Sequence, residues 1–204
     1  MEIDRIESLK SKIGGRIKNH LKEFNVDKNN SKELFIEMCF CILVANNSVE
    51  KTKKVWERMG EDFLKLSEME LRNKLKLLGY RFYKKRSHYI ISARKRLDKI
   101  KKIFELEEKE SREWLVENIM GLGFKESSHF LRNIGYKNFA ILDRHVLRVL
   151  LKYGIIETIP KTLTKKKYLE IENKLKKICE KLNISMAELD LYLFYLETGK
   201  ICEK

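Results

Sequence analysis

Apolar residues recur at steps of three and four positions along almost the whole chain, a spacing that places them on one face of an α-helix. No convincing run of alternating β-branched residues, the pattern of a half-buried strand, interrupts it. We therefore expect an all-α protein. The helical spacing is clearest over residues 33–45, 69–78, 112–119, 143–153 and 165–182.

Turn-forming residues separate the expected helices. Asn and Ser residues at 29–31 precede the first strongly apolar helix, and similar residues at 46–48 follow it. Residues 154–160, which begin with Gly and end with Pro, separate two later helices. Ser185 and Glu188 have the spacing of a capping box, so they predict the start of the last helix.

At 204 residues, the chain is long enough for one domain or two small lobes. We expect two helical lobes. One comprises residues 27–105, and the other combines residues 1–26 with 106–204.

The chain is strongly basic, with 44 Lys and Arg against 30 Asp and Glu and a formal net charge of +14. A lysine-rich, solvated surface would give the same excess. Residues 81–102, however, contain ten Lys or Arg and one acid, Asp98, with Phe82, Tyr83 and Tyr89 among them. Cations next to aromatic rings suit phosphate contacts and base stacking, so we expect nucleic acid as the partner.

No segment approaches the roughly 18 uninterrupted apolar residues that a membrane span needs. Residues 1–12 also lack the apolar core of a signal peptide. We expect a cytoplasmic protein without membrane contact. The cysteines show no C-x-x-C spacing, so we expect neither a metal site nor a disulfide framework, and the first two fit a buried apolar helix. They are Cys39, Cys41, Cys179 and Cys202.

The most specific segment is 115–147, LVENIMGLGFKESSHFLRNIGYKNFAILDRHVL. In it Gly121 and Gly123 flank one aliphatic residue between two amphipathic helices. Two glycines there permit a tight hairpin whose backbone can approach a phosphate closely. The second helix then directs unpaired N–H groups at that phosphate. The pattern indicates a helix-hairpin-helix grip on a DNA backbone, and an ordinary interhelical turn is the alternative.

Lys125 lies two residues after the second glycine, near the expected start of the second helix. The helix dipole disfavours a cation there, which favours the neutral, nucleophilic amine. Such an amine can attack the anomeric carbon of a sugar, expel the base and form a Schiff base that permits β-elimination. A lysine that only binds phosphate is the alternative interpretation.

Asp143 follows the apolar run 140–142 and precedes an apolar helix. An Asp in this place is a good N-cap. A carboxylate beside a scissile glycosidic bond would also stabilise positive charge on the sugar and assist proton transfer. Both roles can coexist, because a capping Asp has a fixed orientation.

The run GLGFKESSHFLRNIG…AILDRHVLR, with Lys125 and Asp143 18 residues apart, resembles the signature of the helix-hairpin-helix DNA glycosylases. KESSHFLRN, CFCILVAN, RFYKKR and a final lysine are similar to the compact archaeal-type 8-oxoguanine DNA glycosylases, the second class. The resemblance implies a bifunctional glycosylase and abasic-site lyase of base-excision repair, with Lys125 as the Schiff-base nucleophile and Asp143 as the catalytic acid. It implies no cofactor. Some relatives carry an iron–sulfur cluster on four C-terminal cysteines, and we expect none here.

The same resemblance suggests four further roles. Asn46 would help to fill the gap left by the flipped nucleotide, and Phe82 would contact the orphaned base. Lys204 would distinguish 8-oxoguanine from guanine. Phe194 stands where close relatives have Trp, and it would stack on the flipped purine with less area. Each of these residues has a core or surface role as its alternative.

Three further polar residues lie near these positions, and one of them, His129, is also a candidate for DNA or base binding. His129 and Arg132 share a helical face with Lys125, at steps of four and seven residues. We favour a buried hydrogen-bonding role for His129 over tuning of the lysine. His145 follows Asp143 closely, without a second His at metal-site spacing.

The sequence thus predicts an all-α fold of two lobes, with a helix-hairpin-helix followed by a catalytic Asp. The expected substrate is duplex DNA that contains oxidised guanine, and we expect a monomer at the nucleoid of a prokaryotic cytoplasm. Two alternatives stay open. The first is the same mechanism on another damaged base, and the second is a non-catalytic DNA-binding module.

Overall fold

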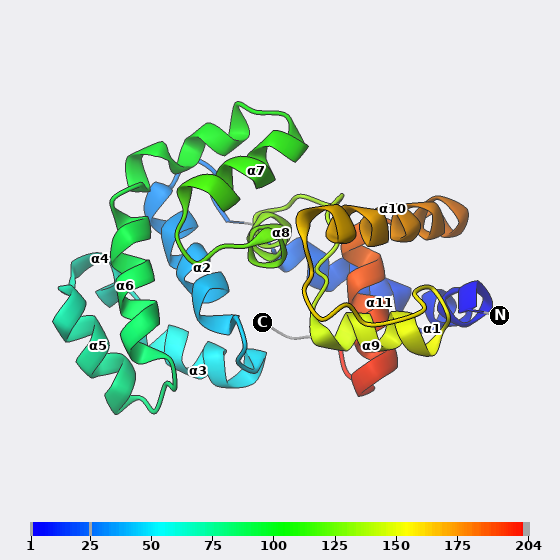
Figure 1. Ribbon diagram of the computed structural model, residues 1–204, viewed down its shortest axis with the longest axis horizontal. Helices are drawn as coiled ribbons and strands as arrows, with labels where there is room; N and C mark the ends of the chain where they lie inside the picture. The colour runs from blue at the N-terminus through cyan, green and yellow to red at the C-terminus, as the bar shows by residue number, and fades with distance from the viewer. Residues whose placement is uncertain (1, 25, 202–204) are drawn as a thin grey trace. The chain divides into compact units, whose positions relative to one another are not determined.

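The computed structural model describes residues 2–24 and 26–201, and within them every regular element is helical (Figure 1). This confirms the all-α prediction. Backbone contacts divide the chain into two units. The central unit comprises residues 26–134, and the described residues of the terminal unit are 2–24 and 135–201.

The described part of the central unit forms the helices α2 (Ser31–Val44), α3 (Val49–Met59), α4 (Asp62–Lys65), α5 (Glu68–Leu77), α6 (Tyr83–Arg94), the 3-10 helix η1 (Leu97–Phe104), α7 (Glu108–Asn118) and α8 (Phe124–Asn133). The described part of the terminal unit forms α1 (Glu2–Glu23), α9 (Arg144–Lys152), α10 (Lys165–Leu182) and α11 (Met186–Thr198).

Helix α2 is the core of the central unit, where it packs against α3, α4, α6, α8 and η1 (Figure 1). A helix with neighbours on several sides is apolar around its circumference, and α2 is buried from Leu34 to Val44 except at one position. Asn30 caps it by accepting hydrogen bonds from two backbone N–H groups of the first turn. Cys39 and Cys41 are fully buried, as the apolar helix predicts.

Helix α11 has the corresponding place in the terminal unit, packed against α1, α9 and α10. The capping box predicted at its start is present. The Ser185 N–H donates to Glu188 Oε2 at 2.8 Å, and the Glu188 N–H donates to Ser185 Oγ at 3.2 Å. Helix α10 covers 165–182, the range that the apolar spacing predicts.

The units divide near residue 134, and the predicted boundary lies at 105. The N-terminal helix groups with the C-terminal helices, but segment 106–134 joins the central unit, because α7 packs on η1 and α8 packs on α2. One buried contact explains the pairing of α8 with α2. Asn133 Nδ2 donates to Glu37 Oε1 at 2.6 Å, and a buried carboxylate is tolerated only with such partners.

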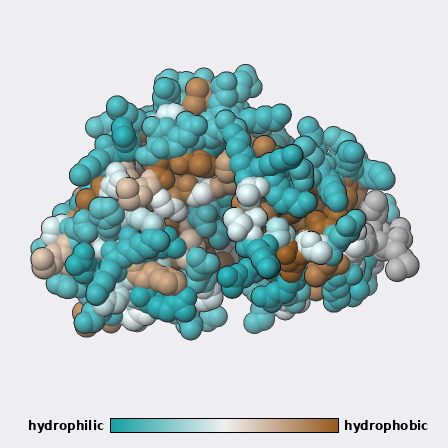
Figure 2. Space-filling model, in the orientation of Figure 1, coloured by the Kyte–Doolittle hydropathy of each residue, from teal (hydrophilic) through white to brown (hydrophobic). Residues whose placement is uncertain are grey.

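Hydrophilic residues cover most of the face of the molecule shown in Figure 2. No helix among the described residues is long and apolar enough to cross a membrane.

Candidate active site

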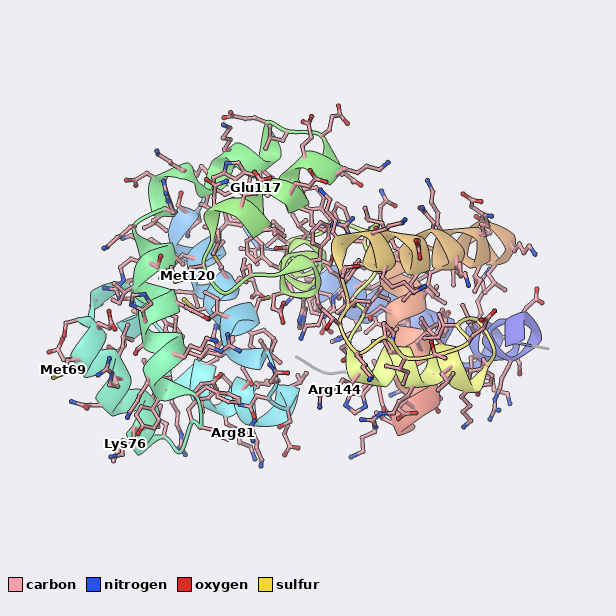
Figure 3. All side chains as sticks on the ribbon, viewed as in Figure 1. Met69, Lys76, Arg81, Glu117, Met120 and Arg144 are labelled. Carbon is pink, nitrogen blue, oxygen red and sulfur yellow. The ribbon has the colours of Figure 1, made fainter. Side chains whose placement is uncertain are left out.

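Helices α7 and α8 are joined by a tight hairpin through residues 119–123. Ile119 and Leu122 anchor it because both side chains are buried, and the Leu122 N–H donates to the Ile119 carbonyl at 3.2 Å. Met120, labelled in Figure 3, is exposed between them. The structure therefore has the predicted order of helix, glycine hairpin and helix.

Gly121 is required for two separate reasons. Its φ of +94° is a conformation that L side chains rarely adopt. A Cβ at this position would also lie 2.4 Å from Cδ2 of Tyr89, on the neighbouring helix α6. Gly123 differs, because its φ of −88° suits any residue. It is the N-cap of α8 and supplies no capping side chain, so the first N–H groups of α8 have no partner from this cap.

Lys125 is the second residue of α8, and 24% of its side chain is exposed. Its Nζ lies 2.9 Å from Oε1 of Glu126, whose side chain is 16% exposed. A carboxylate in the first turn interacts favourably with the helix dipole, and here it also compensates the lysine charge. The amine is thus held at a helix N-terminus by its sequence neighbour.

A buried arginine supports the first turn of α8. The Arg112 guanidinium lies 5.1 Å from the Phe124 ring centre, and its Nη1 donates to Ser128 Oγ at 3.3 Å. Ser128 Oγ in turn donates to the Phe124 carbonyl at 2.8 Å. These contacts fix the backbone on both sides of Lys125.

His129 and Arg132 are both buried on α8. The His129 ring meets Phe40 of α2 edge to face, with 5.9 Å between ring centres. Arg132 donates through Nε and Nη2 to Oδ1 of Asn133, at 3.2 and 3.1 Å. This placement supports the structural interpretation of His129.

Asp143 is the N-cap of α9, as predicted, and its Oδ1 accepts the Val146 N–H at 2.8 Å. Its Oδ2 has no hydrogen-bond partner within the described part of the chain. The residue is half-buried. Capping therefore fixes the carboxylate by one oxygen and leaves the other available.

The segment before Asp143 is buried but not helical, so its backbone groups need partners from elsewhere. Helix α10 supplies them. The Tyr168 hydroxyl donates to the Ala140 carbonyl at 2.6 Å and accepts the Leu142 N–H at 3.4 Å. Glu172 Oε1 accepts the Ala140 N–H at 2.9 Å. Three hydrogen bonds from α10 thus hold the backbone of the segment that precedes Asp143.

Phe194 lies on α11 of the same unit and is half-buried. The His145 ring meets it edge-on, with 6.4 Å between ring centres. Glu197 Oε1 lies 4.0 Å from His145 Nδ1 and 3.6 Å from Arg148 Nη1. The aromatic pair therefore lies where the end of α11 meets the start of α9.

Asn46 and Phe82 both belong to the central unit. Asn46 is exposed in the turn after α2, in a left-handed conformation with φ +61° that Asn tolerates better than most residues. Phe82 precedes α6 and is half-buried, with the Arg81 guanidinium 4.2 Å from its ring centre. Figure 3 labels Arg81 at this end of α6. Lys204 lies outside the described residues.

Residues 17–184 match the family model of the 8-oxoguanine DNA glycosylases with a helix-hairpin-helix. The chain belongs to this 8-oxoguanine DNA glycosylase family. The resemblance seen in the sequence is thereby confirmed. Within residues 2–24 and 26–201, no three His, Cys, Asp or Glu side chains gather as a metal site would require.

Relatives in the 8-oxoguanine DNA glycosylase family match the chain over nearly its whole length. A Methanocaldococcus jannaschii protein named 8-oxoguanine DNA glycosylase/AP lyase is 51% identical over 98% of this chain and 99% of its own. One from Korarchaeum cryptofilum is 45% identical over 94% and 92%. The crystal structure of the M. jannaschii enzyme with a 15mer DNA containing 8-oxoguanine superposes with a TM-score of 0.93, at 46% identity and 98% and 99% coverage. The structure of the Thermotoga maritima 8-oxoguanine DNA glycosylase gives 0.92, at 38% identity and 98% coverage of both chains.

The sequence did not identify Glu126, Tyr168 or Glu172 as residues that support the site. Glu126 follows the lysine directly, but a Glu in a first turn is common and reveals no partner. Tyr168 and Glu172 lie one turn apart on α10, and the sequence does not show which loop they face. Lys125 belongs to the central unit and Asp143 to the terminal unit.

Proposed function

We propose that this protein is a base-excision repair enzyme that removes 8-oxoguanine from duplex DNA and then cleaves the strand at the abasic site. One observation carries the proposal. Lys125 stands in the first turn of a helix that follows a glycine hairpin, in a chain 51% identical to a protein named 8-oxoguanine DNA glycosylase/AP lyase. We place the enzyme in a prokaryotic cytoplasm, because its proposed substrate is chromosomal DNA. We also propose that it acts as a monomer.

The hairpin is the proposed DNA backbone contact. Gly121 allows the turn, and Gly123 leaves the α8 N-terminus open to a phosphate. Asn46 and Phe82 are the proposed contacts within the duplex. Asn46 would help to fill the gap left by the flipped nucleotide, and Phe82 would contact the orphaned base. Both are accessible in the central unit, and the net charge of +14 favours the polyanion.

The proposed chemistry is nucleophilic displacement at the sugar. The neutral amine of Lys125 attacks the anomeric carbon, the bond to the base breaks, and the base leaves with its bonding electron pair. Loss of the amine protons and opening of the sugar ring give a Schiff base. β-Elimination from it then breaks the bond to the 3′ phosphate. The carboxylate of Asp143 stabilises positive charge on the sugar and assists these proton transfers.

Phe194 and Lys204 are the proposed groups for base recognition. Phe194 is accessible on α11 for stacking on a flipped purine. The role of Lys204 rests on its resemblance to the final lysine of this class. His129 is the weakest candidate, because it is buried against Phe40.

The test is a single-turnover assay on matched duplexes that carry 8-oxoguanine, guanine or an oxidised pyrimidine at one position. Base release, strand cleavage and borohydride trapping are measured on each, opposite all four bases. The proposal expects release, cleavage and a covalent adduct with 8-oxoguanine, and little product with guanine. Preference for another lesion would change the substrate, whereas binding without any adduct would identify a DNA-binding module.

A further inference from the structure

Arg86 is a buried cation in the middle of the basic stretch, with only 7% of the residue exposed. Its neighbours Lys84 and Lys85 are exposed, as expected for residues that meet DNA or solvent. A guanidinium that is withdrawn from the surface must act through what it contacts. Its contacts lead to three separate parts of the central unit.

The first contact is with the end of α2. Arg86 Nη2 donates to the Ala45 carbonyl at 2.9 Å, and the next residue is Asn46, with its left-handed φ of +61°. Nearby, the Tyr80 hydroxyl donates a hydrogen bond to the Leu43 carbonyl. The last carbonyls of a helix have no partners within it, so Arg86 and Tyr80 complete the end of α2. They also fix the backbone from which Asn46 projects.

The second contact is with two aromatic rings near the guanidinium. Its carbon lies 5.9 Å from the ring centre of Phe82 and 5.5 Å from that of Tyr89. A flat guanidinium packs favourably on aromatic faces, and the attraction is stronger where water is excluded. Arg86 therefore packs near Phe82, just before the start of α6.

The third contact reaches the hairpin through Tyr89. The Tyr89 ring occupies the space beside Gly121, where a Cβ would lie 2.4 Å from its Cδ2. The Tyr89 ring therefore contacts both the Arg86 guanidinium and the hairpin backbone. Figure 3 labels Met120 of the hairpin beside α6.

We propose that Arg86 is a positioning residue that presets the Asn46 turn, Phe82 and the Gly121 hairpin as one DNA-contacting surface. The inference rests on the proposed function, because it concerns the state in which the duplex is opened and a nucleotide is flipped out. Presetting these groups removes the cost of ordering them when DNA binds. Arg86 does not touch the reacting atoms, so Schiff-base formation itself does not need it.

The experiment compares wild type, Arg86→Met, Arg86→Lys and the control Lys84→Met in single-turnover trapping. One substrate is an 8-oxoguanine duplex, and the other is an abasic site in a single strand, which needs no flipping or gap filling. Arg86→Met should lower the duplex rate about tenfold and leave the single-strand rate within about twofold. Arg86→Lys should restore little, because an ammonium cannot bond Ala45 and pack flat on two rings. Lys84→Met should weaken binding mainly at low salt and keep the wild-type ratio of the two rates.

A second readout does not depend on single-strand activity. A fluorescent 2-aminopurine opposite the lesion reports unstacking of the orphaned base, and Arg86→Met should lose most of the wild-type signal at saturating protein. If Arg86→Met fails to fold, Tyr89→Leu decides, since it removes the ring but keeps the bond to Ala45. The inference is overturned if folded Arg86→Met keeps the wild-type ratio of duplex to single-strand rates and the wild-type 2-aminopurine fluorescence. If Arg86→Met does not fold, the same result for Tyr89→Leu overturns it. Wild-type protein that forms no adduct with damaged duplex overturns the proposed function instead.

Discussion

Glu126 holds the amine of Lys125 at a distance of 2.9 Å, from Oε1 to Nζ, at the N-terminus of α8. The two residues are adjacent in the chain and both are partly buried. The helix dipole disfavours the lysine charge and favours the glutamate charge, so the pair is suited to this end of the helix.

Lys125→Gln should abolish borohydride trapping and strand cleavage, because glutamine has no amine to form a Schiff base. Affinity for damaged duplex should change little. The matched control is Lys109→Gln. Lys109 is also the second residue of its helix, α7, and also precedes a Glu, but it is exposed. Trapping by Lys125→Gln at the wild-type level would refute the assignment.

Asp143→Asn separates capping from catalysis. Asn is as good an N-cap as Asp, so the unfolding free energy should change by less than about 0.5 kcal/mol. The single-turnover rate should fall by about 10²–10³, because the carboxylate charge is lost. Asp143→Ala should lose the same activity and also about 1 kcal/mol of stability. Near-wild-type turnover of Asp143→Asn, measured beside urea denaturation, would make Asp143 a cap only.

The stability of the terminal unit should fall at alkaline pH because of Cys179. Burial, with a smaller effect of Glu188 and Glu180, raises the pKa of this thiol from 9.0 to about 12. Between these values the thiol ionises in the unfolded chain but stays neutral in the folded one, so the unfolding free energy decreases as pH rises above about 9. Cys179→Ala should have a lower unfolding free energy at pH 7, and that free energy should decrease less steeply with pH than in the wild type. Urea denaturation between pH 8 and 10 measures both slopes, and equal slopes would contradict the assignment to Cys179.

The features that were predictable from sequence are those with local causes. The apolar period gave the bounds of α10, and the spacing of Ser185 and Glu188 marked the start of α11. Asp143 as a cap follows from its place before an apolar run. The glycine hairpin follows from Gly121 and Gly123, which lie between two periodic segments.

The features that were not predictable depend on contacts between distant residues. The division between the units follows from α8 packing on α2, which Asn133 and Glu37 secure across 96 positions in sequence. Arg86 belongs to a run of basic residues, and nothing in that run shows that one of them is buried. The partners of the segment before Asp143 lie on α10, and a pattern within one helix does not reveal its tertiary contacts.

Tyr168→Phe tests whether α10 positions Asp143. The substitution keeps the buried ring and removes only the hydroxyl, which serves the Ala140 carbonyl and the Leu142 N–H. Two buried backbone groups then lose a partner, at a cost of about 1–3 kcal/mol of unfolding free energy. The segment before Asp143 gains freedom, so kcat should fall about tenfold while KM changes little, since the proposed DNA contacts at the hairpin stay intact.

Tyr192→Phe is the matched control within the same unit. Tyr192 is also fully buried, but its hydroxyl has no hydrogen-bond partner among the described residues. Removing a buried, unpaired hydroxyl should leave stability unchanged or slightly higher, and kcat unchanged. Urea denaturation and steady-state kinetics on both variants make the comparison. If Tyr168→Phe loses stability but keeps wild-type kcat, the hydroxyl supports the fold and does not position Asp143. Equal effects of the two substitutions would mean that the bonds to Ala140 and Leu142 contribute nothing.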